Sequence, residues 1–250
     1  MEKRLVFFTD LDGTLLDHHS YSWDAAKQGL EAAMRAACPV VIVSSKTRAE
    51  IKPLHQAMGL MSYPYIVENG GAIYFPDGDP LRLGAAYPEL LASLGRAALM
   101  SGAVVRGFAQ MTVAEVAART GLPLRTAALA HQREFDEPFV VESGDEAALA
   151  AAIRALGLEC TRGGRFHHIL GRSSKADAVE RVMERYPGAQ FIGLGDGLND
   201  VGFLKRCDHA WLLPSTQTES LRALLPEARI APEAGPRGWS AAILSELERA

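Results

Sequence analysis

The sequence is poor in cysteine and in long apolar runs, and each shortage argues against a class of protein. Only three cysteines occur in 250 residues, and no two are spaced as Cys-x-x-Cys. We expect Cys38, Cys160 and Cys207 to be buried or incidental thiols in a reducing compartment, because a disulfide framework or zinc site needs paired spacings. No stretch approaches the roughly 20 apolar residues of a membrane span.

The sequence also has no excess of positive charge. The net charge is −4, whereas a nucleic-acid-binding domain carries a basic surface. The first apolar run, Leu5 to Phe8, is short and leads directly to Asp10, unlike a signal peptide. We therefore predict a cytoplasmic globular protein that binds neither nucleic acid nor membranes. Any site for an anionic substrate has to supply its own local positive field.

Strand-like and helix-like segments alternate towards both ends of the chain, which predicts a parallel α/β sheet of the Rossmann-like kind. Thr47 followed by Glu50 three residues later has the spacing of a helix capping box. The expected strands are Arg4–Thr9, Pro39–Val43, Tyr65–Glu68, Gln190–Leu194 and His209–Leu213. The expected helices are Ser22–Ala37, Thr47–Met58, Lys175–Tyr186, Val201–Arg206 and Trp239–Arg249.

Residues 79–171 separate the two halves of this pattern. A plain β-α-β crossover takes about 30 residues, so this longer segment predicts an α+β domain inserted into a core of residues 1–78 and 172–250. Its expected helices are Pro88–Met100, Val113–Thr120 and Asp145–Leu156. Its expected strands are Phe139–Glu142, Glu159–Arg162 and Arg165–Leu170.

Two carboxylates, Asp10 and Asp12, follow the first predicted strand and precede Gly13. Open α/β sheets bind ligands at the carboxyl ends of their strands, and residues two apart in an extended chain point the same way. Two acids this close repel each other unless one is protonated or a cation lies between them. Oxygen ligands favour Mg²⁺. An isolated Asp-x-Asp is usually a surface turn, but the buried strand before this one favours a site.

A second acidic motif follows the predicted strand Gln190–Leu194 and contains Asp196, Asn199 and Asp200. On its own it is as typical of an ordinary Asn/Asp/Gly loop as of metal ligation. Paired with the motif at Asp10, it predicts a metal site that two strand ends share.

Ser44 and Lys175 complete the set of polar candidates. Ser44 follows the strand Pro39–Val43, where its hydroxyl can donate to a phosphoryl oxygen or cap the next helix. Lys175 begins a predicted helix, where a cation opposes the helix dipole. An anionic partner explains that placement, while a solvated surface lysine is the ordinary alternative.

Asp10, Ser44, Lys175 and Asp196, in this order, resemble the four motifs of the haloacid dehalogenase-like superfamily across essentially the whole core. The Glu-Asn-Gly-Gly segment at 68–71, followed by the insert, resembles the class IIB cap of its sugar phosphatases. Within that group, the chain is similar to the mannosyl-3-phosphoglycerate phosphatase family. The marks of that similarity are Ser-Ser-Lys-Thr at 44–47, Arg-Glu-Phe-Asp-Glu-Pro at 133–138 and Gly-Arg-Phe-His-His at 164–168.

The resemblance implies a Mg²⁺-dependent phosphatase whose substrate is a small phosphorylated sugar or glycerate and whose product, mannosylglycerate, is a compatible solute. Asp10 would be the nucleophile that forms an aspartyl-phosphate, and Asp12 would be the acid/base. Ser44 and Lys175 would stabilise the phosphoryl oxygens. The implied metal ligands are Asp10, the backbone carbonyl of Asp12, Asp196 and Asp200.

The insert is expected to select the substrate. Recognition of a glycerate carboxylate and sugar hydroxyls needs hydrogen-bond donors. The candidates, in the insert and in the core beside it, are Lys46, Asn69, Arg165, His167, Arg172, Ser173 and Asn199. On sequence alone, His131, Arg133 and His168 serve equally well. Two other functions stay open: a phosphatase or phosphomutase for another sugar phosphate, and a non-catalytic binding protein on the same fold. The second would lack a motif residue, and none is lacking here. The sequence does not predict the oligomeric state.

Overall fold

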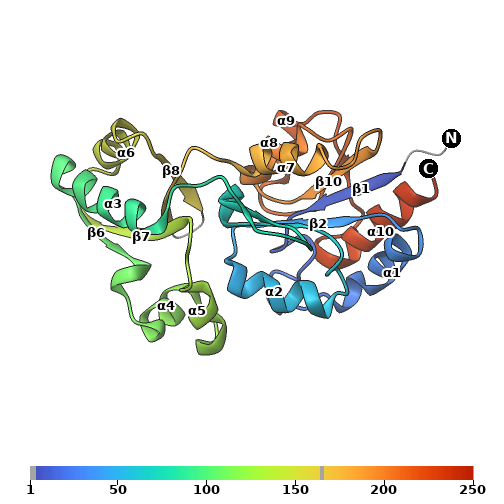
Figure 1. The fold of residues 1–250 in the computed structure, drawn as a ribbon, viewed down its shortest axis with the longest axis horizontal. Coiled ribbons are helices and arrows are strands. Elements are labelled where there is room, and N and C mark those ends of the chain that lie inside the picture. The colour runs from blue at the N-terminus through green and yellow to red at the C-terminus, as the bar shows by residue number, and fades with distance from the viewer. Residues whose placement is uncertain (1–3, 164–165, 250) are drawn as a thin grey trace.

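The computed structural model describes residues 4–163 and 166–249, and their strands form two sheets (Figure 1). The larger sheet has the order β12-β11-β10-β1-β2-β3-β4-β5. Its strands are β1 (Leu5–Thr9), β2 (Val40–Val43), β3 (Tyr65–Val67), β4 (Ala72–Tyr74), β5 (Leu81–Arg82), β10 (Gln190–Gly195), β11 (His209–Leu212) and β12 (Arg229–Ile230). All neighbours from β12 to β3 are parallel, which confirms the predicted parallel α/β core, and β4 and β5 add an antiparallel edge.

Alternating side chains along β1 divide the core into two apolar layers. Leu5 and Phe7 face one layer, and Val6 and Phe8 face the other. The first layer is covered by α1 (Lys27–Arg35), α2 (Arg48–Ala57) and α10 (Gly235–Leu247). The second is covered by α7 (Lys175–Met183), α8 (Val201–Leu204) and α9 (Thr218–Leu224), on the opposite side of the sheet in Figure 1. A β1 strand buried on both faces is what a parallel sheet requires.

The smaller sheet is antiparallel and has the order β6-β7-β9-β8. Its strands are β6 (Val104–Gly107), β7 (Asp136–Ser143), β8 (Glu159–Gly163) and β9 (Phe166–Leu170). One face packs through Phe139 against α3 (Tyr87–Ser101) and α6 (Glu146–Ala155). The other face packs through Val140 against the cluster beside α4 (Val113–Thr120) and α5 (Leu124–Ala130). Two covered faces give this sheet an apolar core of its own.

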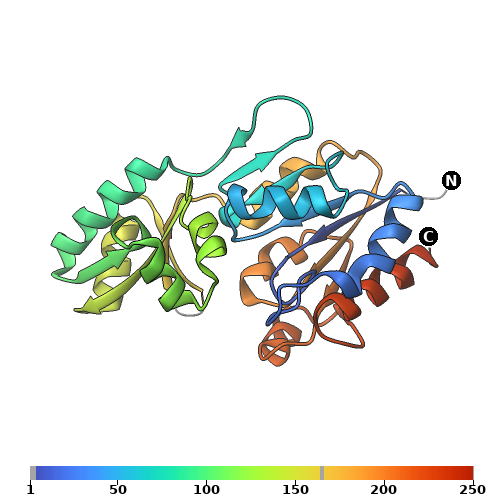
Figure 2. The ribbon, with the colours of Figure 1, turned by 90° about the horizontal axis from the view of Figure 1, so that it is seen from below.

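The two sheets lie side by side, joined by the segments after β5 and before α7 (Figure 2). Leu81–Arg82, which the sequence analysis assigned to the insert, pairs with β4 in the larger sheet. The described residues also contain short 3-10 helices at η1 (Asp24–Ala26), η2 (Glu68–Gly70), η3 (Phe108–Gln110) and η4 (Leu198–Asp200). No helix in these residues has the length and apolarity that crossing a membrane requires.

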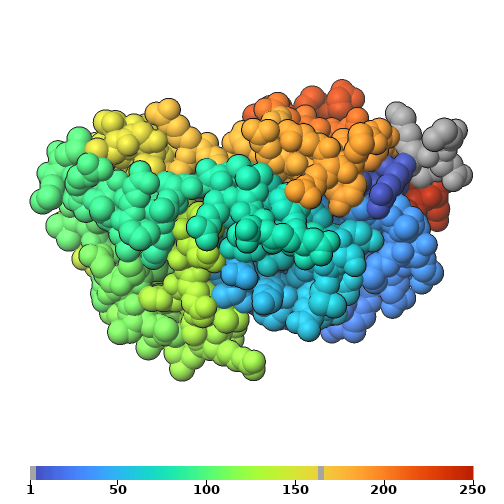
Figure 3. Space-filling view, in the orientation of Figure 1, coloured from blue at the N-terminus to red at the C-terminus, as the bar shows by residue number. Residues whose placement is uncertain are grey.

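The insert also touches the core away from the two linkers. Helix α5 packs against α2, and the Thr47 hydroxyl donates to the Leu129 carbonyl at 3.0 Å. In the space-filling view, the green α4–α5 region reaches towards the blue α2 region below the linkers (Figure 3). Thr47 also accepts from the Glu50 amide and caps α2, so the predicted capping box is confirmed. This contact closes one side of the space between the two sheets.

Candidate active site

The carboxyl ends of β1 and β10 bring the two acidic motifs together. The strands are parallel neighbours with Thr9 opposite Leu194, and the Asp10 amide donates to the Leu194 carbonyl at 2.9 Å. Asp10 and Asp196 therefore leave the same edge of the sheet. The Trp239 indole in α10 donates to the Thr9 hydroxyl at 2.9 Å, and this bond fixes the last residue of β1.

Lys175 bridges the two acidic motifs. Its Nζ lies 2.6 Å from Asp10 Oδ1 and 2.7 Å from Asp200 Oδ1, and its side chain is 3% exposed. Burial alone would lower the pKa of Lys175, but the carboxylates of Asp10 and Asp200 outweigh it and raise that pKa. The lysine is thus a fixed cation rather than the solvated surface group that the sequence left open.

The remaining negative charge exceeds what Lys175 neutralises. Carboxylate oxygens of Asp10, Asp196 and Asp200 lie within 4.8 Å of one another. Burial raises the pKa of Asp10 well above its ordinary value, and Asp200 and Asp196 oppose its ionisation further. Burial, then repulsion from Asp200, raises the pKa of Asp196 to about 6. Three carboxylates facing one lysine fit a divalent cation, because its charge relieves this repulsion and hard oxygen ligands suit Mg²⁺.

Hydrogen bonds from one hydroxyl and two amides, and the close approach of a glycine, keep these carboxylates in place. Thr14 donates to Asp196 Oδ1 at 3.0 Å, and the amides of Asp196 and Gly197 donate to Asp200 Oδ2 at 3.2 and 3.0 Å. Gly13 has a φ of +77°, and a Cβ there would lie 2.5 Å from Asp196 Oδ2. Glycine is required at this position both for the left-handed backbone and for the close approach of the carboxylate.

Asp12 faces a different partner from Asp10. Its Oδ2 lies 3.0 Å from Lys46 Nζ, and Lys46 is also 3.5 Å from Glu50 Oε1. Asp12 Oδ1 is buried and has no hydrogen-bond partner among the described residues. The side chain of Asp12 therefore stands outside the three-carboxylate cluster, with one oxygen left over for a ligand.

Ser44 lies at the same edge, directly after β2. Its hydroxyl accepts from the Lys46 amide at 3.1 Å, and its own amide donates to the Ile66 carbonyl at 3.1 Å. The side chain is 1% exposed. Because the Ser44 oxygen accepts from the Lys46 amide, the hydroxyl proton stays available to donate to a bound anion.

A cavity of about 310 Å³ opens beyond Asp12, between the two sheets. Tyr21, Ser45, Lys46 and Glu50 line it from the core. The opposite wall comes from the insert and consists of Phe108, Thr120, Arg133, Pro138, Phe166 and His168. Phe166 belongs to the Gly-Arg-Phe-His-His segment, but no motif indicated Phe108, since an apolar residue that lines a cavity has the same sequence pattern as one in the core.

The predicted substrate donors divide between this cavity and other places. Lys46 lines the cavity, whereas Asn69 donates to Asp136 at 3.1 Å and ties the two sheets together. His167 does not line this cavity: it points to the other face of β9, stacks on Phe139 and lies 3.4 Å from Glu146. The reason is the alternation of a strand, which turns adjacent side chains to opposite faces.

The other candidates lie off the cavity wall or outside the described residues. Arg172 is exposed and donates to the Gly157 carbonyl at 3.1 Å. Asn199 is exposed in η4, and Ser173 is partly buried before α7. Arg165 lies outside the described residues. Of the alternates, Arg133 and His168 line the cavity, while His131 Nε2 lies 3.0 Å from the Met111 carbonyl.

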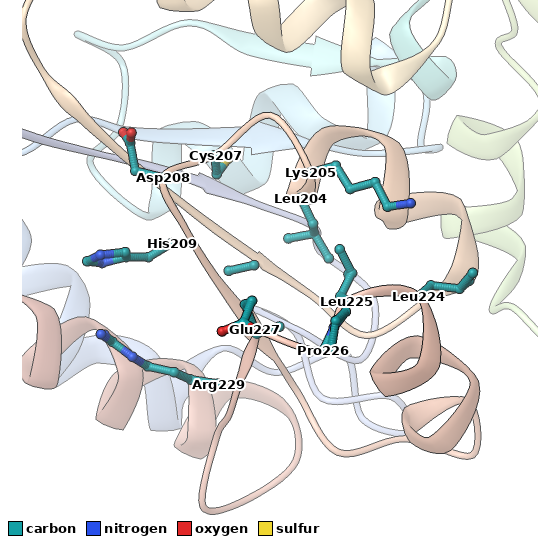
Figure 4. Close-up of a pocket in the computed structure, with 12 residues that line it drawn as sticks. Leu204, Lys205, Cys207, Asp208, His209, Leu224, Leu225, Pro226, Glu227 and Arg229 are labelled. Atoms are coloured by element: carbon teal, nitrogen blue, oxygen red, sulfur yellow. The ribbon is translucent and has the colours of Figure 1, made fainter.

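A second cavity, of about 470 Å³, lies away from this edge (Figure 4). Cys207 and Asp208 line it just before β11, and Leu225 and Pro226 line it after α9. The start of a strand is the edge opposite to the one that holds Asp10, so this larger cavity does not reach the acidic cluster.

Sequence and structure comparisons agree with this arrangement. Residues 7–87 match the family model of the haloacid dehalogenase-like hydrolases. A glucosyl-3-phosphoglycerate/mannosyl-3-phosphoglycerate phosphatase of Persephonella marina is 34% identical over 98% of this chain and 99% of its own. A protein of the same name from Methanococcoides burtonii is 35% identical over 96% of each chain. The chain therefore belongs to the haloacid dehalogenase-like hydrolases.

Within that family the chain is a phosphatase, as the expected motif set implied. Its fold is that of a solved subclass IIB sugar phosphatase, with a TM-score of 0.71 at 16% identity over 97% of this chain and 98% of the other. The predicted core with an inserted cap is thus confirmed as a fold. The insert is the cap of this fold.

Proposed function

We propose that the protein hydrolyses mannosyl-3-phosphoglycerate to mannosylglycerate and phosphate. The observation that supports this most is the similarity to phosphatases of that name at 34% and 35% identity over nearly the whole of both chains. The cavity beyond Asp12 also supports the proposal. Its basic side chains suit a leaving group that carries a carboxylate, and a sugar can pack against its aromatic rings.

In this proposal Asp10 attacks phosphorus and the ester oxygen leaves. The Asp10 carboxylate becomes an aspartyl-phosphate, and Asp12 gives its proton to the leaving alkoxide. Asp12 then takes a proton from the water that hydrolyses the intermediate, which restores both residues. Asp12 is suited to this because it lines the cavity into which the leaving group departs, and Asp10 does not.

Lys175 and Ser44 serve the transferred phosphoryl group. Lys175 is already 2.6 Å from the attacking carboxylate, so its charge lies close to the phosphoryl oxygens that bind there and can stabilise them without rearrangement. The Ser44 hydroxyl donates to another phosphoryl oxygen. Mg²⁺, held by Asp10, Asp196 and the backbone of Asp12 with Asp200 in support, would neutralise phosphoryl charge. We also propose that the chain divides into a core and a cap of about residues 79–171, except that Leu81–Arg82 belongs to the core sheet.

A panel of phosphate esters tests the substrate. Phosphate release is measured with mannosyl-3-phosphoglycerate, glucosyl-3-phosphoglycerate, 3-phosphoglycerate and mannose 6-phosphate, each with Mg²⁺ and with a chelator. The proposal expects the mannosyl ester to have the highest kcat/KM and every rate to vanish on chelation and to return with Mg²⁺. A higher kcat/KM for a simple sugar phosphate refutes the named substrate. Full activity with chelator refutes the metal.

A further inference from the structure

Two of the basic side chains that line the cavity beyond Asp12 already form ion pairs with carboxylates of the protein. Lys46 Nζ lies 3.0 Å from Asp12 and 3.5 Å from Glu50. His168 Nδ1 lies 2.9 Å from Asp136, which is fully buried. An arriving anion would have to compete with these partners for either group.

Arg133 also lies near carboxylates, but within the described residues it donates a hydrogen bond to none of them. Its side chain is 7% exposed, and among the described residues it donates one hydrogen bond, from Nη1 to the Ser45 carbonyl at 2.9 Å. Glu68 lies 4.0 Å away, beyond hydrogen-bond distance, and its oxygens already accept from the amides of Glu134 and Phe135. The Nε of Arg133 is buried and has no partner among the described residues.

A buried guanidinium with an unused donor is costly unless a ligand completes it. The planar fork of arginine binds a carboxylate through two parallel hydrogen bonds. Arg133 lines the cavity that starts at Asp12, which protonates the leaving group in the proposed mechanism. The carboxylate of a phosphoglycerate unit is only a few bonds from the ester oxygen, so it enters this cavity with the leaving group.

We propose that Arg133 is the residue that recognises the carboxylate of the substrate. This assignment rests on the proposed function. Arg133 is held by the loop that carries Ser44, through its bond to Ser45, so it spans the gap between cap and core. It therefore selects esters whose leaving group is acidic over esters of neutral sugars, and it does so without contacting the phosphoryl group.

The test compares two esters that differ only in the recognised group. One is mannosyl-3-phosphoglycerate, and the other is its analogue with the carboxylate reduced to a primary alcohol. The kcat/KM ratio of acid to alcohol is measured for the wild type, Arg133→Gln, Arg133→Lys and the control Arg125→Gln, which changes an exposed arginine in α5. We expect Arg133→Gln to lower the ratio by about 100-fold, because a buried charge pair loses one partner.

Each outcome decides the assignment. A ratio that falls in Arg133→Gln, recovers partly in Arg133→Lys and stays at the wild-type value in Arg125→Gln supports it. Equal losses for both esters in both Arg133 variants make Arg133 a structural residue and refute the assignment alone. A wild type that does not prefer the acid refutes the proposed substrate and this assignment with it. Circular dichroism and turnover of the alcohol report whether each variant is folded.

Discussion

Replacing the buried Glu68 with glutamine tests how the cap is fastened to the core. Glu68 follows β3, is 1% exposed and accepts the amides of Glu134 and Phe135 at 2.8 to 3.2 Å. Burial raises its pKa from an ordinary 4.5 to about 7, although Arg133 acts in the opposite direction. Near neutral pH the folded protein therefore holds a proton that the unfolded chain has released.

The pH dependence of stability follows from the difference between the pKa of Glu68 in the folded protein and in the unfolded chain. A carboxyl group that binds its proton more tightly when folded makes stability fall as pH rises from about 4.5 to about 7 and level off above. At about 1.36 kcal/mol per pKa unit, the group contributes a loss of about 3 kcal/mol across that window. Glutamine does not ionise, so Glu68→Gln should gain about 3 kcal/mol relative to the wild type between pH 4.5 and 8.

Urea unfolding at pH 4.5, 6, 7 and 8, in the presence of a chelator, measures this difference. Glu142→Gln is the matched control, because Glu142 is exposed at the end of β7. The reasoning is refuted if the free energies of unfolding of the wild type and Glu68→Gln keep a constant difference across the series. It is also refuted if Glu142→Gln shows the same gain.

Two substitutions in the core should act through the acidic cluster. Gly13→Ala should cost about 1–2 kcal/mol of stability, because alanine is strained in the left-handed backbone conformation. It should also weaken Mg²⁺ binding, measured by calorimetry, because the new Cβ would displace Asp196. An unchanged Mg²⁺ affinity would contradict this. Lys175→Met should remove detectable turnover and destabilise the metal-free protein by about 3–5 kcal/mol, since it leaves Asp10 and Asp200 without their cation. Urea unfolding with a chelator measures the loss of stability in Lys175→Met. If that variant is as stable as the wild type, Asp10 and Asp200 are protonated in its folded state, which contradicts the expected loss.

Much of the core could be predicted because its signals are local. The segments around Phe7 and Ile42 are buried on both faces and appear in the sequence as continuous apolar runs, so β1 and β2 were predicted nearly residue for residue. Thr47 and Glu50 predicted their capping box because that interaction lies within one turn. By contrast, the two-residue strand at Arg229–Ile230 depends on pairing with β11, which no local pattern contains.

The cap side of the site could not be predicted for a related physical reason. Phe166 and His168 face the cavity and His167 faces away, but a one-residue shift would reverse all three, and the sequence of β9 does not indicate its face. The place of Arg133 depends on how the cap meets Ser45 across the domain gap. The position of Asp10 could be predicted without knowing any contact between cap and core, because the carboxyl ends of parallel strands lie at one edge of the sheet.

The central claim is that Asp10 carries the phosphoryl group during turnover. Rapid acid quenching during turnover, followed by mass spectrometry of the peptide that contains residue 10, measures it directly. The wild type should show phosphorylated Asp10 while substrate is in excess, and Asp10→Asn should show neither the modification nor turnover. An unmodified Asp10 in the wild type during turnover, together with near-normal turnover in Asp10→Asn, would contradict the account.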